Sequence, residues 1–239
     1  MKSFTCLAFL LMSFSVYGQV PRTDAMVRNW GDKGQVSSQR CTDVSNEQAE
    51  CSFSWNDPSE NLETGHSIAI TSFGPLKGVA TATVNGYVAA KEIGSFSGAD
   101  EWAYDTISFD NLTVPAFVRV EGSTSYKLSG SGKASVRYSV NLGLHGCEVN
   151  NETVEHTCTF KTPVKPGDTM RLERTLFSSL MVRLTNFPSG SEKNGSVSVG
   201  FPPDDGDGAT MKLFVVGNDG RPIEGVNVVG KSGHVYAQQ

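Results

Sequence analysis

The feature that most constrains this chain is a two-residue alternation of apolar and polar side chains. The longest example runs from Ala134 to Leu142, where every second residue is apolar and the residues between are polar. Shorter examples occur at residues 180–185, 196–201 and 211–215. A β-strand points successive side chains to opposite faces, so such a run buries one face and leaves the other in water. The alternation is typical of antiparallel sheets, because strands of parallel sheets are apolar on both faces.

Turn-forming residues divide these runs into short strands. Gly130, Pro166-Gly167 and Asn218-Asp219-Gly220 stand between strand-like segments, as residues that favour tight bends do. Residues 91–105, a mixture of Gly, Ser, Phe and Trp, predict a long loop or one short helical turn. Many short strands joined by turns predict an all-β, single-domain antiparallel β-sandwich, jelly-roll-like in its connections. An up-and-down barrel is the structural alternative.

The N-terminus has the layout of a signal peptide. Met1-Lys2-Ser3 supplies a positive charge, an apolar segment follows over residues 6–14, and small residues lead to Gly18. The apolar segment is too short to span a bilayer, and small residues before the cut are typical of secretory signals. We therefore expect a signal peptide over residues 1–18, a poorly patterned lead-in over 19–35 and the β-sandwich domain over 36–239. No later window of the sequence is apolar for long enough to predict a transmembrane segment after cleavage.

Four cysteines remain in the expected mature chain, namely Cys41, Cys51, Cys147 and Cys158. Three disulfide connectivities are open. Local closure, Cys41 with Cys51 and Cys147 with Cys158, is favoured because each pair flanks a polar stretch between strand-like runs, which brings the partners together across a hairpin. A four-cysteine zinc site normally needs Cys-x₂₋₄-Cys spacing, and neither pair has it. Disulfides indicate an oxidising compartment.

Charge and one motif bear on nucleic acid and nucleotide binding. The formal net charge is −5, with acidic and basic residues interspersed, so nothing attracts a phosphate backbone and we expect no nucleic acid partner. Residues 225–232 match the phosphate-loop pattern G-x-x-x-x-G-K-S. That loop works with the N-terminus of a following helix, whereas Val235 and Tyr236 favour a strand. We therefore expect a hairpin with a Ser-Gly turn there, and no nucleotide.

Two groups of residues are candidate ligand sites, and no catalytic residue is predicted. Trp102 and Tyr104 lie in the predicted loop, where exposed aromatic rings would stack against sugars; burial in a core is the commoner fate of such rings. Asp204, Asp205 and Asp207 offer oxygen ligands of the kind that calcium prefers, although a solvated turn explains the same run and the EF-hand glutamate is missing. The nucleophile-elbow pattern G-x-S-x-G does not occur, so a hydrolase triad has no starting point.

Some of the strand-like segments resemble those of a known family. The stretches concerned are residues 80–84, the pair 117–129 with 132–142, and the final segment from Ala209 through Asn218-Asp219-Gly220 to Tyr236. They resemble the exported β-sandwich domain of bacterial exosortase-sorted surface proteins, the PEP-CTERM class. The resemblance implies fold, export and a bacterial source, but no site residues. The C-terminal sorting tail of that class is not in this sequence, which ends at Gln238-Gln239, so anchoring at the surface is not implied.

These features together predict a secreted, non-enzymatic protein of the cell exterior, extracellular or associated with the cell surface, with a structural or adhesive role. Its expected partners are extracellular glycans or components of the cell surface or matrix. The alternative is a carbohydrate-binding module that uses Trp102 and Tyr104, with calcium as its one candidate cofactor. A third hypothesis is a glycan-cleaving enzyme on a jelly-roll scaffold, since the carboxylate pairs of glycosidases are set by spatial distance and have no sequence spacing.

Overall fold

The fold is seen in a computed structural model, which describes residues 21–31, 36–43, 48–56, 63–74, 76–85, 92–150, 155–185, 190–200 and 208–238. The expected signal peptide lies outside them. Every regular element of the described part is a β-strand, and its strand pairs are antiparallel. No helix among the described residues is long and apolar enough to cross a membrane. The predicted antiparallel β-sandwich is confirmed, while the jelly-roll connections stay a prediction.

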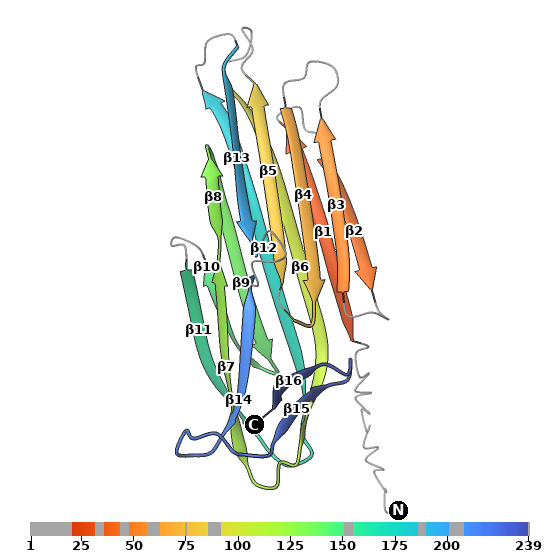
Figure 1. The fold of residues 1–239 in the computed structure, drawn as a ribbon, viewed down its shortest axis with the longest axis vertical. Coiled ribbons are helices and arrows are strands. Elements are labelled where there is room, and N and C mark those ends of the chain that lie inside the picture. The colour runs from red at the N-terminus through yellow and green to blue at the C-terminus, as the bar shows by residue number, and fades with distance from the viewer. Residues whose placement is uncertain are drawn as a thin grey trace, which may run out of the picture.

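One layer of the sandwich is an eight-stranded sheet. Six strands follow the order β10-β9-β12-β6-β1-β2, and the C-terminal hairpin β15-β16 adds to the free edge of β6 beyond β1. The bounds of the eight strands are β1 Arg22–Gly31, β2 Val36–Asp43, β6 Glu92–Asp110, β9 Lys133–Leu142, β10 His145–Asn150, β12 Thr169–Thr185, β15 Asn227–Gly230 and β16 Val235–Gln238. The two long strands β6 and β12 pair along the whole of β12 and extend through most of the height of the molecule (Figure 1).

The other layer consists of two smaller sheets placed end to end (Figure 1). A five-stranded sheet has the order β3-β4-β5-β13-β8, and a three-stranded sheet has the order β11-β7-β14. Their bounds are β3 Gln48–Asn56, β4 Glu63–Ser72, β5 Lys77–Asn85, β7 Ala116–Ser125, β8 Lys127–Gly130, β11 Glu155–Val164, β13 Glu192–Val199 and β14 Thr210–Val216. A bridge between Leu76 and Ala209 joins the two sheets.

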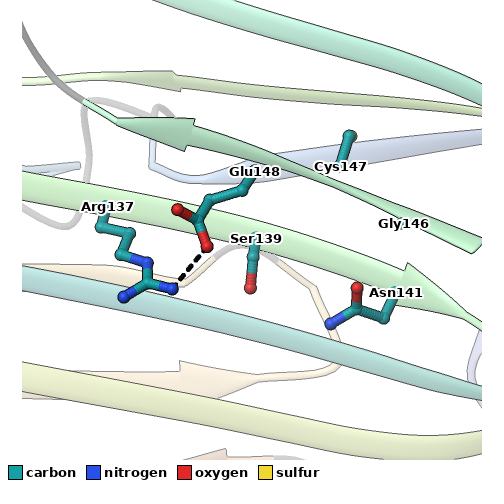
Figure 2. Close-up of a pocket in the computed structure, with 6 residues that line it drawn as sticks. All are labelled: Arg137, Ser139, Asn141, Gly146, Cys147 and Glu148. Atoms are coloured by element: carbon teal, nitrogen blue, oxygen red, sulfur yellow. Dashed lines mark hydrogen bonds and ion pairs between the residues drawn. The ribbon is translucent and has the colours of Figure 1, made fainter.

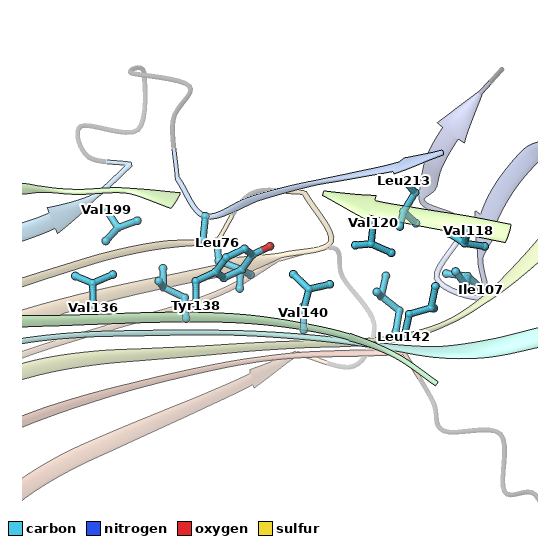
Figure 3. Packing of buried hydrophobic residues seen from close by; sticks show 14 of the residues in the cluster. Leu76, Ile107, Val118, Val120, Val136, Tyr138, Val140, Leu142, Val199 and Leu213 are labelled. Atoms are coloured by element: carbon cyan, nitrogen blue, oxygen red, sulfur yellow. The ribbon is translucent and has the colours of Figure 1, made fainter. Parts of the chain in front are cut away.

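The core lies between the layers and follows the predicted alternation. On β9, Tyr138, Val140 and Leu142 are fully buried, and they face the buried Val118 and Val120 of β7 across the sandwich (Figure 3). The intervening residues of β9 point to the opposite side of the sheet. Burial of a Val or Leu side chain stabilises a fold by about 1.5–3 kcal/mol, so this shared apolar layer holds the two sheets together.

Two predictions about local structure were wrong, because strands form where the sequence shows no clear alternation. Strand β1 occupies most of the expected lead-in, and β6 replaces the loop predicted at 91–105. The inward positions of β6 carry Ser95, Ser97 and Ala99. Ser97 Oγ donates to the carbonyl oxygen of His66 (2.6 Å) and lies 2.6 Å from Ser67 Oγ. Hydrogen bonds between the layers therefore satisfy polar groups that periodicity alone would assign to water.

The predicted disulfide pairs are present, but they do not cross hairpins. Cys41 pairs with Cys51, ten residues away, and Cys147 pairs with Cys158, eleven residues away. Strands β2 and β3 belong to different sheets, as do β10 and β11. Each disulfide therefore joins an edge strand of the eight-stranded sheet to an edge strand of the opposite layer, and the two bonds close the sandwich at its two edges.

Replacement of Cys147 and Cys158 together by serine should lower the free energy of unfolding by about 3 kcal/mol, because the bond closes a short loop in the unfolded chain. Denaturant unfolding of the oxidised variant and wild type measures the difference. The Cys41–Cys51 disulfide closes a loop of similar length. Replacement of both its cysteines by serine should therefore lower the free energy of unfolding by a similar amount. An unchanged unfolding midpoint would contradict the prediction, as would a non-reducing peptide map that links the two halves of the chain.

Candidate functional site

The eight-stranded sheet has a second side, which faces away from the core and which we call the outer face. Strand register defines its members, because residues directly opposite each other on antiparallel strands point to the same side. One row runs across five strands through Glu148, Ser139, Thr175, Trp102 and Asp24. The neighbouring rows contain Asn141, Glu173, Tyr104 and Arg22 on one side, and Arg137, Phe177, Asp100 and Met26 on the other.

Trp102 and Tyr104 lie in the middle of the outer face. The sequence placed them in a loop, whereas they are two residues apart on the central strand β6, and both are half-buried. The Trp102 ring packs edge-on against Phe177, with ring centroids 5.6 Å apart. The Arg171 guanidinium lies 5.5 Å from the centre of the Tyr104 ring. Neighbouring strands hold both rings in place, so the aromatic surface is preorganised rather than carried on a loop.

Arginine side chains cover two carboxylates on one half of the outer face. Asp24 accepts hydrogen bonds from Arg22 (2.9 Å) and Arg40 (3.1 Å), and Asp100 forms an ion pair with Arg28 (2.6 Å). The two carboxylate side chains are buried, while the arginines remain about 40–60 % exposed. Burial raises the pKa of Asp100, and the charge and hydrogen bond of Arg28 oppose this shift. Each pair therefore fixes an exposed guanidinium at a defined position on the sheet.

The other half of the outer face contains a shallow depression of about 360 Å³ over β9 and β10. Figure 2 shows Arg137, Ser139 and Asn141 of β9 pointing to one side of the sheet, with Glu148 of β10 above them. Arg137 and Glu148 form an ion pair of 2.5 Å. The depression thus offers hydroxyl, amide, guanidinium and carboxylate groups. Ser139 also lies 2.6 Å from Thr175 Oγ1, in the same row as Trp102.

The structure describes the phosphate-loop segment, residues 225–232, but not the candidate calcium ligands. Asp204, Asp205 and Asp207 lie outside the described residues, so the calcium site stays a prediction. Among the described residues, no three His, Cys, Asp or Glu side chains gather as metal ligands. The phosphate-loop segment forms strand β15 and the turn into β16, the predicted hairpin, with a positive φ at Gly233. Ser232 Oγ donates to the carboxylate of Asp105 (2.5 Å), so this hydroxyl holds the hairpin to β6.

A buried carboxyl group in the interior has no counterpart in the sequence prediction. Glu101 points into the sandwich from β6 and is fully buried, and neither of its carboxyl oxygens has a hydrogen-bond partner. It fits because β5 has a glycine opposite: a Cβ on Gly78 would lie 2.5 Å from both Glu101 Oε1 and Ser178 Oγ. Burial raises the pKa of Glu101 well above its usual value, and the charge of Asp100 raises it further.

Glu101 should make the stability of the fold depend on pH. Above a pH of about 4.5, the unfolded chain releases this proton while the folded chain keeps it, so the free energy of unfolding falls as pH rises. We expect the free energy of unfolding of Glu101→Gln to lack this dependence on pH. The difference in the free energy of unfolding between the variant and wild type should therefore grow by about 1.4 kcal/mol per pH unit until the carboxyl group of the folded wild type ionises. Denaturant unfolding from pH 4 upward measures the difference.

The control for this experiment is Glu192→Gln, which changes an exposed glutamate of β13. It should keep the pH dependence of the wild type. If the free energy of unfolding depends on pH in the same way for wild type and Glu101→Gln, the Glu101 carboxyl group is ionised in the folded protein. That result would contradict the prediction.

No protein-family model and no curated protein matches this sequence. The chemistry of the outer face is therefore inferred from its own residues. Aromatic rings on a central strand are flanked on both sides by hydrogen-bonding groups that ion pairs hold in place. Such a surface is suited to a ligand with both an apolar face and many hydroxyl groups.

Proposed function

We propose that this protein is a secreted, non-enzymatic adhesive protein that binds carbohydrate through the outer face of its eight-stranded sheet. The observation that carries the proposal is the position of Trp102 and Tyr104, two residues apart on β6 and pointing outward between polar groups of neighbouring strands. A sugar ring has a C–H-rich face that packs on an aromatic ring, and its hydroxyls hydrogen-bond to side chains around it.

The width of the site favours an extended glycan chain over a small molecule. The row from Trp102 to Glu148 crosses four neighbouring strands, and strands lie about 4.8 Å apart. Several sugar units therefore have room along one row. The depression at Arg137 and Asn141 would receive hydroxyl groups at the far end of such a chain.

Export supports a partner outside the cell. The signal-peptide layout of the first residues and two disulfides that close the sandwich are those of a protein that folds in an oxidising compartment. The resemblance to exported domains of bacterial surface proteins points in the same direction. A role in adhesion follows from combining an extracellular location with a wide, preorganised binding surface.

A binding role suits the carboxylates of the outer face better than hydrolysis does. Glu148 pairs with Arg137 and Glu173 pairs with Arg171 at 3.0 Å. A glycosidase of the usual kind needs one carboxyl group as a proton donor and a second as nucleophile or base. Carboxylates held by arginine are instead suited to accept hydrogen bonds from sugar hydroxyls.

The experiment is a glycan-array screen of the purified mature chain, followed by calorimetry on the best ligand. Trp102→Ala should weaken binding by about tenfold or more, because it removes the stacking surface from the centre of the face. Phe214→Ala is the matched control, since Phe214 is an aromatic residue of β14 stacked by Arg119 on the other layer; it should leave binding unchanged. Thermal unfolding of both variants separates lost binding from lost structure.

Three results would overturn the proposal. They are no glycan bound by the wild type, unchanged affinity in folded Trp102→Ala, and an equal loss in Phe214→Ala. The same array with a chelator tests the calcium prediction at Asp204, Asp205 and Asp207. Loss of glycan binding in the presence of the chelator would support a role for calcium. Unchanged glycan binding would contradict the calcium prediction.

A further inference from the structure

A second surface feature lies on the opposite layer, where the five-stranded sheet ends and the three-stranded sheet begins. A pocket of about 250 Å³ opens there, and it is lined by Phe73, Gly74, Arg174, Thr210, Met211, His234 and Tyr236. The β4–β5 turn, the start of β14 and the C-terminal hairpin form its walls. Arg174 comes from β12 of the eight-stranded sheet. The pocket therefore passes through the second layer and ends at a side chain of the first.

Arg174 brings a buried positive charge to this pocket. It is only 2 % exposed and is the largest fully buried side chain of the described residues. Its guanidinium donates hydrogen bonds to the backbone carbonyl oxygens of Ser72 (2.8 Å), Phe73 (2.7 Å) and Gly74 (2.5 Å). These acceptors are neutral, and no described carboxylate pairs with the guanidinium. A buried charge is costly unless an opposite charge accompanies it.

Asp105 of β6 is a buried acidic group, but its side-chain hydrogen bonds come from the hairpin and not from Arg174. Asp105 accepts hydrogen bonds from Tyr236 Oη (2.8 Å), Ser232 Oγ (2.5 Å) and the backbone N–H of Thr106 (2.7 Å). These bonds use the carboxylate to hold the hairpin, and Asp105 does not line the pocket. Among the described lining residues, the guanidinium is thus the charged group that an entering ligand meets, and no lining residue is acidic.

The walls define the rest of the ligand. The rings of His234 and Tyr236 pack edge-on with centroids 4.7 Å apart, and His234 lies 6.5 Å from the Phe73 ring. With Met211, these side chains give an apolar wall beside the guanidinium. The volume is below the roughly 300–1,000 Å³ of sites for drug-sized ligands. We propose that this pocket binds a small organic carboxylate, whose anionic end pairs with Arg174 and whose body lies against Met211 and the rings of His234 and Tyr236.

The test uses benzoate, with benzamide as the neutral molecule of the same shape and sulfate as the inorganic anion. Amide NMR signals of Gly74, Thr210 and Met211 should move on titration with benzoate. Benzamide should bind at least about tenfold more weakly, because a charge-assisted hydrogen bond is lost. Sulfate should also bind more weakly, because it makes no use of the apolar wall.

Substitution of Arg174 would leave three backbone carbonyls without donors, so the pocket is better blocked from its wall. Met211→Trp fills space in the pocket while Arg174 stays in the sequence to bond the three carbonyls, and it should abolish the benzoate-induced shifts. Phe214→Trp introduces the same side chain on the outward side of the same strand and should keep them. The site is independent of the glycan-binding face, so Trp102→Ala should also bind benzoate normally.

Equal binding of benzoate and benzamide would overturn the charge recognition, and equal binding of sulfate would overturn the organic ligand class. Benzoate binding that survives in Met211→Trp, or shifts centred on Trp102 instead of Gly74, would place the ligand elsewhere. Absence of any shift at high benzoate concentration would overturn the proposal as a whole. None of these results depends on whether a glycan binds to the outer face.

Discussion

The pairing of β6 with β12 is the constraint on which the rest of this structure depends. The two strands are paired along the whole of Thr169–Thr185, so they form one continuous pair of strands that lies opposite both sheets of the second layer. The five-stranded and three-stranded sheets are linked by the chain itself, since Tyr126 alone separates β7 from β8, and by a bridge between Leu76 and Ala209. Both sheets also pack through one shared apolar core against the eight-stranded sheet that contains these two long strands.

That central position explains why ionisable side chains occur inside the sandwich. Glu101 and Asp105 are on β6 and Arg174 is on β12, and all three are buried. Each of two residues on these strands holds a segment that is distant in the sequence. Asp105 bonds to the C-terminal hairpin, and Arg174 bonds to the β4–β5 turn. Several hydrogen bonds satisfy the polar atoms of each of these two groups, whereas Glu101 has none and burial raises the pKa of its carboxyl group. Asp105 and Arg174 thus join distant segments of the chain, whereas Glu101 does not.

The same two strands also carry the proposed binding surface. Because side chains alternate, each residue that packs the core places its neighbour on the outer face, and Trp102 and Phe177 are outward neighbours of buried Glu101 and Leu176. The core thus fixes the outer rings within tight limits. Loops join the strands only at their ends, so the centre of this face is a rigid part of the sheet. Rigidity lowers the entropy that a binding surface loses when it holds a ligand.

The sequence by itself determined the fold class and the disulfide pairs. Alternation over Ala134–Leu142 predicted the buried and exposed sides of β9 residue by residue, since burial on one side of an antiparallel strand depends only on residue parity. It also identified Trp102 and Tyr104 as residues of interest, although in a loop. Strand β6 escaped prediction because polar residues such as Ser97 and Asp105 point inward and bond to partners far away in the chain, and because Glu101 is buried in spite of its ionisable group.

Only the tertiary structure decided where these elements meet. The cysteine pairs proved to join opposite sheets, because β2 and β3, like β10 and β11, lie in different layers instead of pairing with each other. The outer face assembles Arg137, Phe177, Trp102 and Asp24 from four strands that are far apart in sequence. The Arg174 pocket likewise draws on β12, the β4–β5 turn, β14 and the hairpin. Such neighbourhoods follow from strand order and register between strands, which the periodicity within one strand does not contain.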